Sequence, residues 1–323
     1  MPQTRELNHL DPVAEAVSAS LPSIDGSLLL AGNFTALLPE ARRMRREQGY
    51  LCVALGEPQQ RVLGAALAAA KRFFSCDDGV KSRVHAGDRG SGWTPSGEEP
   101  AYQPGTISSV ESFDASLGLI QGNEKHGFPE LEGFENATVA CWDQLLDIAD
   151  PLLELIGLSC DIAPDFLPGH CGTRKLNTMR LLRYPPDQGP RGAEEVGIAA
   201  HTDFECITLL YQDSPGLELR QPDGRWVEAP SGAGQLIVLF DDMLETWTNG
   251  LVQATGHRVR RPAAERHSIV MFVAVDEGVV VRPLPQFVEC GTEAAYAPRE
   301  QAAHIAAEMA RARHNALESK VGK

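Results

Sequence analysis

The chain has 323 residues, 43% of them hydrophobic, which is enough to bury a sizeable core. Its net charge of −15 argues against partners such as nucleic-acid backbones or anionic membrane surfaces, which are bound through clustered lysine and arginine. Seven scattered cysteines without a C-x-x-C pair favour neither a disulfide framework nor a thiolate zinc site, and no apolar run reaches the length of a membrane span. We therefore expect a soluble, cytoplasmic protein that binds neither nucleic acid nor membranes, with its oligomeric state left open.

The first part of the chain, to about residue 170, is expected to be a mixed α and β portion that wraps the rest. Apolar residues recur there at helical spacing or in short runs that end at turn residues. These patterns predict an edge strand at 21–25, a strand at 50–55, and helices at 35–48, 59–74 and 134–158.

Residues 86–125 are rich in Gly, Ser, Pro and Glu and show little periodicity. A stretch of this length in a compact domain is more often a functional cover than a neutral connector. We therefore predict a loop that covers the site, with Trp93 and Tyr102 as candidate substrate contacts. A plain surface loop is the alternative for either residue.

Beyond residue 174 the pattern changes to short β-branched or alternating runs, most of them separated by Gly, Pro, Asp or Asn. Such regular short strands are typical of a β-sandwich or barrel. We expect a mainly β core at about 174–285 with flanking helices, an Ala-rich helix at about 300–318, and one domain overall. The predicted strands cover 175–184, 205–211, 216–220, 225–228, 235–240, 252–259, 267–275 and 279–282.

A candidate metal site lies at the start of this β region, in the sequence His201-Thr202-Asp203. In an extended segment, residues i and i+2 project from the same face, so both side chains can bind one ion. This motif is weak by itself and needs a third ligand from a distant strand. His257, at the start of a later strand, is the candidate. Two imidazoles and one carboxylate on one face form the ligand set of non-haem Fe(II) oxygenases.

Arg266 and Ser268 share one face of the strand that follows His257. A guanidinium buried in such a strand needs an anionic partner. Its planar fork suits a carboxylate, to which the serine hydroxyl can donate as well. The alternative is an internal ion pair with an aspartate or glutamate. Phe272, on the same face of this strand, is a candidate substrate contact.

The strand that ends at Tyr184 carries Leu182 and Arg180 on the same face. If that face lines the pocket, the Tyr184 phenol can donate to the carboxylate that Arg266 binds. Arg180 would then reach toward the substrate, which makes an anionic substrate one option. A surface arginine is the equal alternative for Arg180.

Taken together, these motifs resemble the isopenicillin N synthase-like family of 2-oxoglutarate/Fe(II)-dependent dioxygenases. The likeness runs from about residue 21 to 285. It departs from the family at Leu182, where many relatives have asparagine, and at Asp241-Asp242, where Gly-Asp is familiar. The motifs that carry it are Tyr-Pro-Pro at 184–186, H-x-D at 201–203, Thr-Asn-Gly at 248–250, His-Arg-Val at 257–259 and R-x-S at 266–268.

The resemblance implies a double-stranded β-helix, or jelly roll, in which His201, Asp203 and His257 bind Fe(II). It also implies that Arg266, Ser268 and Tyr184 hold the distal carboxylate of 2-oxoglutarate. The expected activity is the oxidation of a small molecule with O2, by hydroxylation, desaturation or cyclisation, with release of succinate and CO2. Two alternatives remain: an oxidase of the same family that does not use 2-oxoglutarate, and a non-catalytic β-sandwich binding protein.

Overall fold

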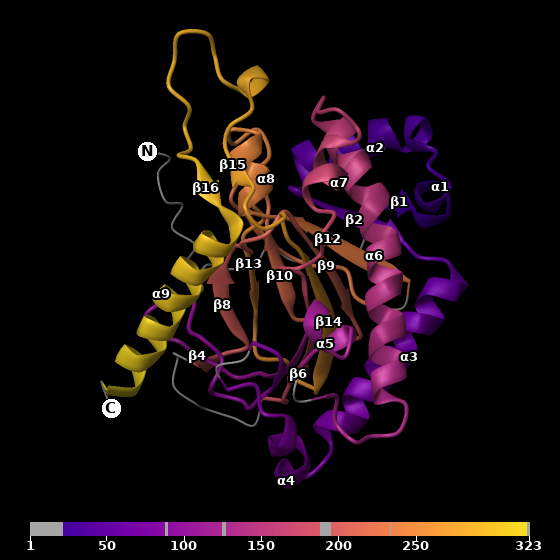
Figure 1. Cartoon of the computed structure of the whole chain (residues 1–323), viewed down its shortest axis with the longest axis vertical. Coiled ribbons are helices and arrows are strands. Elements are labelled where there is room, and N and C mark those ends of the chain that lie inside the picture. The colour runs from indigo at the N-terminus through magenta and orange to yellow at the C-terminus, as the bar shows by residue number, and fades with distance from the viewer. Residues whose placement is uncertain (1–21, 88–89, 125–126, 188–194, 233, 322–323) are drawn as a thin grey trace.

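The computed structural model describes residues 22–87, 90–124, 127–187, 195–232 and 234–321. Two β-sheets form the centre, and helices cover the outside (Figure 1). The larger sheet has eight strands in the order β1-β2-β12-β9-β14-β6-β5-β3, and the smaller has four in the order β11-β10-β13-β8. Apart from the parallel edge pair β1 and β2, neighbouring strands in these two sheets are antiparallel.

The strands are β1 Ile24–Asp25, β2 Tyr50–Ala54, β3 Gly92–Thr94, β4 Ile107–Ser108, β5 Glu111–Ser116, β6 Thr178–Tyr184, β7 Glu195–Val196, β8 Ile198–His201, β9 Ile207–Gln212, β10 Leu217–Arg220, β11 Trp226–Glu228, β12 Gln235–Phe240, β13 His257–Val259, β14 Arg266–Val273, β15 Val280–Val281 and β16 Arg299–Glu300.

The helices are α1 Gly26–Leu30, α2 Phe34–Glu47, α3 Glu57–Phe74, α4 Asp78–Lys81, α5 Leu117–Ile120, α6 Phe134–Ser159, α7 Phe166–His170, α8 Asp242–Trp247 and α9 Gln301–Val321, with 3-10 turns at Ser82–Val84 and Pro285–Phe287.

The eight-stranded sheet has a mainly apolar outer face, and polar residues gather on the part of its inner face that β5, β6 and β14 form. Side chains alternate across a strand, so Phe113 of β5 and Leu181 of β6, which are paired in register, point to the same side. This outer face is covered by α3 and α6, and the rings of Phe73 and Phe134 lie 5.3 and 5.1 Å from that of Phe113. Burial of these large apolar side chains fixes the helices to the sheet.

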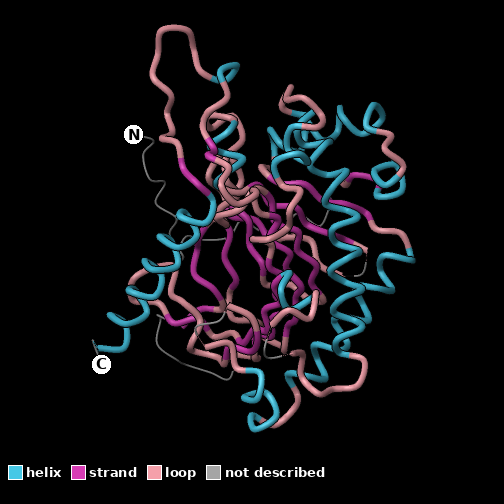
Figure 2. The backbone as a smooth tube through the Cα atoms, in the orientation of Figure 1, coloured by secondary structure: helices cyan, strands magenta, loops and turns pink. Residues whose placement is uncertain are grey.

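The opposite, inner face of this sheet turns toward the four-stranded sheet, and Figure 2 shows the strands gathered inside the helical cover. Alternation places Arg266, Ser268, Tyr184, Leu182 and Arg180 on this inner face, in the paired strands β14 and β6. Two facing antiparallel sheets with helices outside confirm the predicted jelly-roll fold. The region between the two sheets, into which these side chains point, is called the chamber below.

Most of the predicted elements are present. The long helices at 35–48, 59–74, 134–158 and 300–318 are confirmed as α2, α3, α6 and α9, and the strand at 50–55 as β2. The strand predicted at 252–259 is shorter, because only His257–Val259 pairs with neighbours. Helices α7 and α8 and strand β8 were not predicted, since each is a short segment of six residues or fewer.

The prediction of a loop at 86–125 was wrong in part. Strands β3 and β5 lie within it and extend the eight-stranded sheet beyond β6, while Ile107–Ser108 pairs with Glu195–Val196. In β5, polar Ser112 and Asp114 face inward and alternate with outward-facing Phe113 and Ala115. The segment therefore forms part of the sheet and also contains helix α5, while its residues between β3 and β4 remain loop.

All seven cysteines are free thiols. Among the described residues, no helix combines the length and apolar character that a bilayer crossing requires.

The contact between the outer face and the helices can be tested with Phe113→Ala. Loss of a fully buried ring removes apolar burial and leaves a cavity, so we expect the free energy of unfolding to fall by about 3–5 kcal/mol. Chemical denaturation measures this change. Leu30→Ala, at a side chain that is 42% exposed, is the control and should change it by less than about 0.5 kcal/mol. An equal effect of both substitutions would contradict this packing.

Candidate metal centre and cofactor pocket

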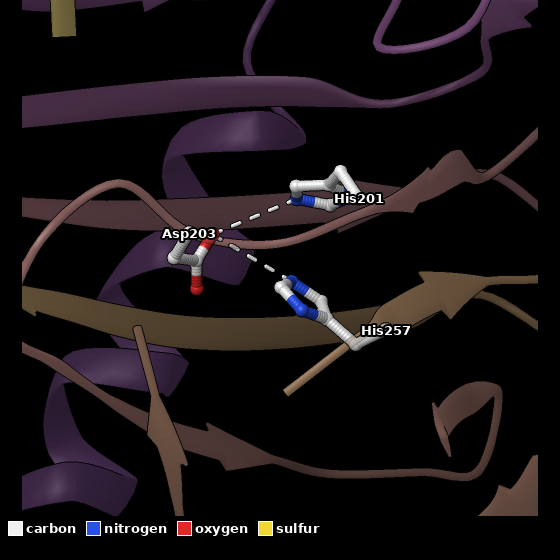
Figure 3. Close-up of side chains that lie close together, drawn as sticks. All are labelled: His201, Asp203 and His257. Carbon is white, nitrogen blue, oxygen red and sulfur yellow. Dashed lines mark ion pairs between the residues drawn. The ribbon is translucent and has the colours of Figure 1, made fainter. Parts of the chain in front are cut away.

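His201, Asp203 and His257 converge in the chamber between the sheets (Figure 3). One potential ligand atom from each side chain lies within 4.8 Å of the other two. Asp203 Oδ1 is 3.6 Å from His201 Nε2 and 3.7 Å from His257 Nε2. The other carboxylate oxygen, Oδ2, is buried and has no hydrogen-bond partner among the described residues. Two imidazoles and a carboxylate at these separations could hold a divalent metal ion.

The pairing of β8 with β13 brings the two histidines together. His201 and His257 are directly opposite each other in this antiparallel pair, with ring centroids 4.1 Å apart. Asp203 follows the end of β8 and returns to the same face as His201. Gly197 permits the close approach of the strands, because a Cβ at that position would lie 2.6 Å from the carbonyl oxygen of Val259.

Backbone carbonyls orient both imidazoles. His201 Nδ1 lies 2.8 Å from the oxygen of Ala199, and His257 Nδ1 lies 3.1 Å from that of Thr255. A proton on each Nδ1 satisfies these hydrogen bonds and leaves each Nε2 as a lone-pair donor. Burial, with a smaller contribution from His257, lowers the pKa of His201 well below its ordinary value, which favours the neutral, metal-binding form.

A buried guanidinium lies in the same chamber. Arg266 is fully buried, donates from Nη2 to Oε1 of Gln212 at 2.6 Å, and has its guanidinium carbon 4.5 Å from the centre of the Tyr184 ring. Its Nε and Nη1 have no hydrogen-bond partner among the described residues, and neither does Oγ of Ser268. Unpartnered buried groups of this kind are strongly destabilising. The residues therefore fit a bound carboxylate, as predicted from R-x-S.

The register of β14 and β6 explains this grouping. Arg266 is opposite Tyr184, and Ser268 is opposite both Leu182 of β6 and Gln212 of β9. Burial raises the pKa of Tyr184, so its phenol remains a neutral donor. Gln212 is a member of the pocket that the sequence interpretation missed. Gln212 directly follows the strand predicted at 205–211, and this position could have indicated that its side chain lies at the end of a core strand.

Tyr102 covers one side of the metal centre. Its ring is stacked on that of His201, with centroids 4.0 Å apart and planes 7° from parallel. The covering segment is held by Gln103, which donates to the oxygen of Ala200 at 3.0 Å, and by α9. The Ala101 N–H donates to the oxygen of Ala312, and Asn315 Nδ2 donates to the Ala101 oxygen, both at 3.1 Å.

A cavity of about 930 Å³ adjoins this stack on the side of α9. Tyr102, His201, Thr202, Phe204 and His304 are among the residues that line it. Tyr102 therefore lies both at the cavity and against the imidazole of His201.

The other substrate candidates separate into two groups. Leu182 and Phe272 lie on the inner face, as predicted. Trp93 does not: the β3–β5 register places it beside outward-facing Phe113, and its Nε1 donates to Glu111 Oε2 at 2.9 Å. The prediction that Trp93 contacts substrate is therefore corrected, because its ring belongs to the outer packing.

Arg180 also differs from expectation. It lies on the inner face, but its guanidinium already binds Asp114 through two contacts of 2.7 Å and Glu99 through one of 3.3 Å. Its charge is thus compensated within the protein, and it is not available as the receptor of an anionic substrate. The sequence interpretation missed both carboxylates, which lie in the segment expected to be a loop.

The two aspartates that depart from the family pattern have different surroundings. Asp241 is fully buried and accepts a hydrogen bond from Thr208 Oγ1 at 3.0 Å. Asp242 lies 2.7 Å from Nε2 of His304 and so connects α8 with α9. Neither belongs to the three residues that could hold the metal.

Comparison with known proteins finds similarity to 2-oxoglutarate-Fe(II) proteins both in a family model and in individual relatives. Residues 176–275 match the model of the 2OG-Fe(II) oxygenase superfamily. The chain is 30% identical to the 2-oxoglutarate-Fe(II) type oxidoreductase hxnY of Emericella nidulans over 53% of this chain and 50% of that protein. It is 27% identical to the 2-oxoglutarate-Fe(II) type oxidoreductase ppzD of Metarhizium rileyi over 70% of this chain and 71% of that protein. The first of these matches thus spans only half the length of the relative.

Among solved structures, that of a full-length Neurospora crassa protein in complex with alpha-KG is similar, with a TM-score of 0.78 and 22% identity. The superposition covers 90% of this chain and 96% of that one. At this identity the likeness concerns the fold, which agrees with the two-sheet architecture described above.

Removal of one candidate metal ligand tests this candidate metal centre. We expect Asp203→Ala to weaken Fe(II) binding by more than about a hundredfold, since a lost outer-shell partner alone costs ten- to hundredfold. Anaerobic calorimetric titration measures the affinity. His85→Ala, at a histidine outside the chamber with a side chain that is 39% exposed, is the control and should bind normally. Unchanged affinity in Asp203→Ala would exclude this centre.

The cover can be tested with Tyr102→Ala and Tyr102→Phe. A stacked ring pair contributes about 0.5–1.5 kcal/mol, so its loss should accelerate removal of the bound metal by a chelator about two- to tenfold. Tyr102→Phe retains the ring and should behave as the unchanged protein does. Equal rates in all three proteins, followed by stopped-flow absorbance, would show that Tyr102 does not restrict access.

Proposed function

Because residues 176–275 match the model of the 2OG-Fe(II) oxygenase superfamily, we propose that the chain belongs to it and oxidises a small-molecule substrate with Fe(II), 2-oxoglutarate and O2. Bound Fe(II) would supply the oxygen chemistry, in which O2 is activated while 2-oxoglutarate is converted to succinate and CO2. Hydroxylation, desaturation and cyclisation are all compatible with this chemistry. The portion at 174–285 carries the residues that we assign to the metal and the co-substrate.

In this proposal His201, Asp203 and His257 are the Fe(II) ligands. Their support is the convergence of two Nε2 atoms and one carboxylate in a buried chamber. Because carbonyl oxygens hold both Nδ1 atoms, the imidazoles need no rearrangement to present Nε2 to a metal. Three protein ligands on one face leave positions for the co-substrate and O2.

The guanidinium of Arg266, whose Nε and Nη1 have no hydrogen-bond partner among the described residues, is the observation that carries the assignment of 2-oxoglutarate. It is buried and ionised, and among the described residues no carboxylate bonds to its Nε or Nη1. A carboxylate of the co-substrate would accept from this fork, and Ser268 and Tyr184 would donate to the same group.

The main alternative is an oxidase of the same family in which Arg266 binds a carboxylate of the substrate itself. Succinate formation separates the two activities. The proposed enzyme forms succinate from 2-oxoglutarate in the presence of Fe(II) and O2, whereas the oxidase does not. A non-catalytic binding protein would form no succinate under any condition and would not need the metal ligands.

The role of Arg266 can be tested with Arg266→Lys. Lysine retains the positive charge but not the planar fork, so we expect the Kd of 2-oxoglutarate to rise about ten- to a hundredfold, as for a lost charged hydrogen bond. Anaerobic titration of the Fe(II)-loaded protein measures this affinity. Arg258→Lys is the matched control, because Arg258 is also buried but pairs with Glu218 at 2.7 Å. Unchanged 2-oxoglutarate affinity in Arg266→Lys would favour the oxidase.

A further inference from the structure

Gln212, the last residue of β9, provides a hydrogen-bond acceptor for the guanidinium of Arg266. Nη2 of Arg266 donates to Oε1 of Gln212 at 2.6 Å, and both residues are buried, with exposed fractions of 0% and 2%. Gln212 is opposite Ser268 in the β9–β14 pair, two residues along β14 from Arg266. The amide therefore lies directly beside the group that we assign to the carboxylate of the co-substrate.

The orientation of this amide is fixed by hydrogen bonds on both of its polar atoms. Nε2 of Gln212 donates to the carbonyl oxygen of Pro230 at 2.8 Å, while Oε1 accepts from the guanidinium. A guanidinium offers only donors and a carbonyl oxygen only accepts, so rotation of the amide by half a turn would break both hydrogen bonds. Gln212 therefore presents its oxygen, and not its nitrogen, to Arg266.

The acceptor of Arg266 differs in charge from that of another buried arginine. Arg258, which is 5% exposed, is neutralised by the carboxylate of Glu218 at 2.7 Å. Arg266 is buried more deeply, yet Gln212 is a neutral amide, and Nε and Nη1 have no hydrogen-bond partner among the described residues. A glutamate in place of Gln212 would have nearly the same shape and would neutralise the guanidinium.

A buried charge without a counter-ion is costly, so the amide has a consequence for ligand binding. It fixes the place of the guanidinium through one N–H and leaves the positive charge for an anion that comes from outside. A carboxylate at the same place would fix the guanidinium equally well, but it would complete an internal ion pair and compete with that anion.

We infer that Gln212 is a positioning residue for the co-substrate, and that its neutrality is the property on which binding depends. It holds Arg266 in place while the charge of the guanidinium stays available to the distal carboxylate of 2-oxoglutarate. The inference rests on the function proposed above. It adds the reason why Arg266 binds a carboxylate of a ligand instead of forming an ion pair within the protein.

The contribution of the distal carboxylate can be measured with two probes of equal length, 2-oxoglutarate and 2-oxopentanoate. They share the 1-carboxylate and the 2-oxo group, but 2-oxopentanoate has a methyl group in place of the distal carboxylate. Each is titrated calorimetrically into the full chain loaded anaerobically with Fe(II). The ratio of the two Kd values, here called the carboxylate preference, should be about ten to a hundred in the unaltered protein, as for hydrogen bonds to a charged group.

Two variants separate the charge of Gln212 from its shape. Gln212→Glu is isosteric but adds a carboxylate beside Arg266, so the carboxylate preference should fall to about one. Gln212→Met keeps the length of the side chain and leaves the guanidinium charge unpaired, so loss of the single hydrogen bond should reduce the preference only about two- to fivefold. A purely structural role predicts the reverse order, because glutamate preserves the size and polarity of glutamine better than methionine does.

Gln301→Glu is the matched control. Gln301, the first residue of α9, is also a fully buried glutamine with both polar atoms of its amide bonded. Its Oε1 accepts from the Val275 N–H at 3.1 Å, and its Nε2 donates to the oxygen of Phe204 at 2.8 Å. Neither atom contacts Arg266, so this substitution should leave the carboxylate preference unchanged. Thermal unfolding verifies that each variant is folded.

An undiminished carboxylate preference in folded Gln212→Glu, a larger loss in Gln212→Met than in Gln212→Glu, or an equal loss in Gln301→Glu would each overturn the inference. If Gln212→Glu does not fold, Gln212→Met decides: a reduced preference supports the inference and an undiminished one overturns it.

The unaltered protein tests the proposed function separately. If 2-oxoglutarate does not bind, the proposed function fails. If both probes bind equally well, the assignment of Arg266 to the distal carboxylate fails, and the role of Gln212 fails with it. If 2-oxoglutarate binds with the expected preference and folded Gln212→Glu retains that preference, only the role of Gln212 fails.

Discussion

The geometry of the site depends on the antiparallel register between β8 and β13. This register places His201 opposite His257, and a slip of one residue would turn one imidazole to the other face of the sheet. Asp203 then needs only the two-residue period of an extended chain to join them. The absence of a Cβ at Gly197 lets the strands approach closely enough for the pairing. Register, more than any individual contact, therefore determines whether the three ligand atoms converge.

The sequence was most informative where a residue's partners follow from strand periodicity. Arg266, Ser268 and Tyr184 could be grouped because the inward positions of adjacent strands recur every second residue, and their register matches that expectation. The fold class and the long helices were predictable for similar reasons, since their apolar spacing is sustained. The roles of these residues in binding metal and co-substrate remain predictions that the geometry supports.

Interactions between segments distant in sequence could not be predicted. Strand β5 has few β-branched residues and places Ser112 and Asp114 on the inner face, so it lacks the apolar signal of a strand. Because that strand was not predicted, the pairing of Arg180 with Asp114 could not be predicted either, and Arg180 was expected to be available to a substrate. Trp93 was misassigned for the same reason, because only the β3–β5 register shows that it faces outward. Strands with polar inward-facing residues are therefore difficult to predict from the sequence, although these residues contribute most to the chemistry of the site.

The hydrogen bonds between Ala101 and α9 have a consequence for the order in which the site is completed. They join positions more than 200 residues apart, since Asn315 donates to Ala101 across a separation of 214 residues. During synthesis the jelly-roll strands emerge before α9, so the histidines and Asp203 can assemble while the segment bearing Tyr102 has the bond from Gln103 to Ala200 but still lacks its bonds to α9. The same hydrogen bonds couple the position of the segment bearing Tyr102 to the folding of the C-terminal helix, so that loosening either one loosens the other.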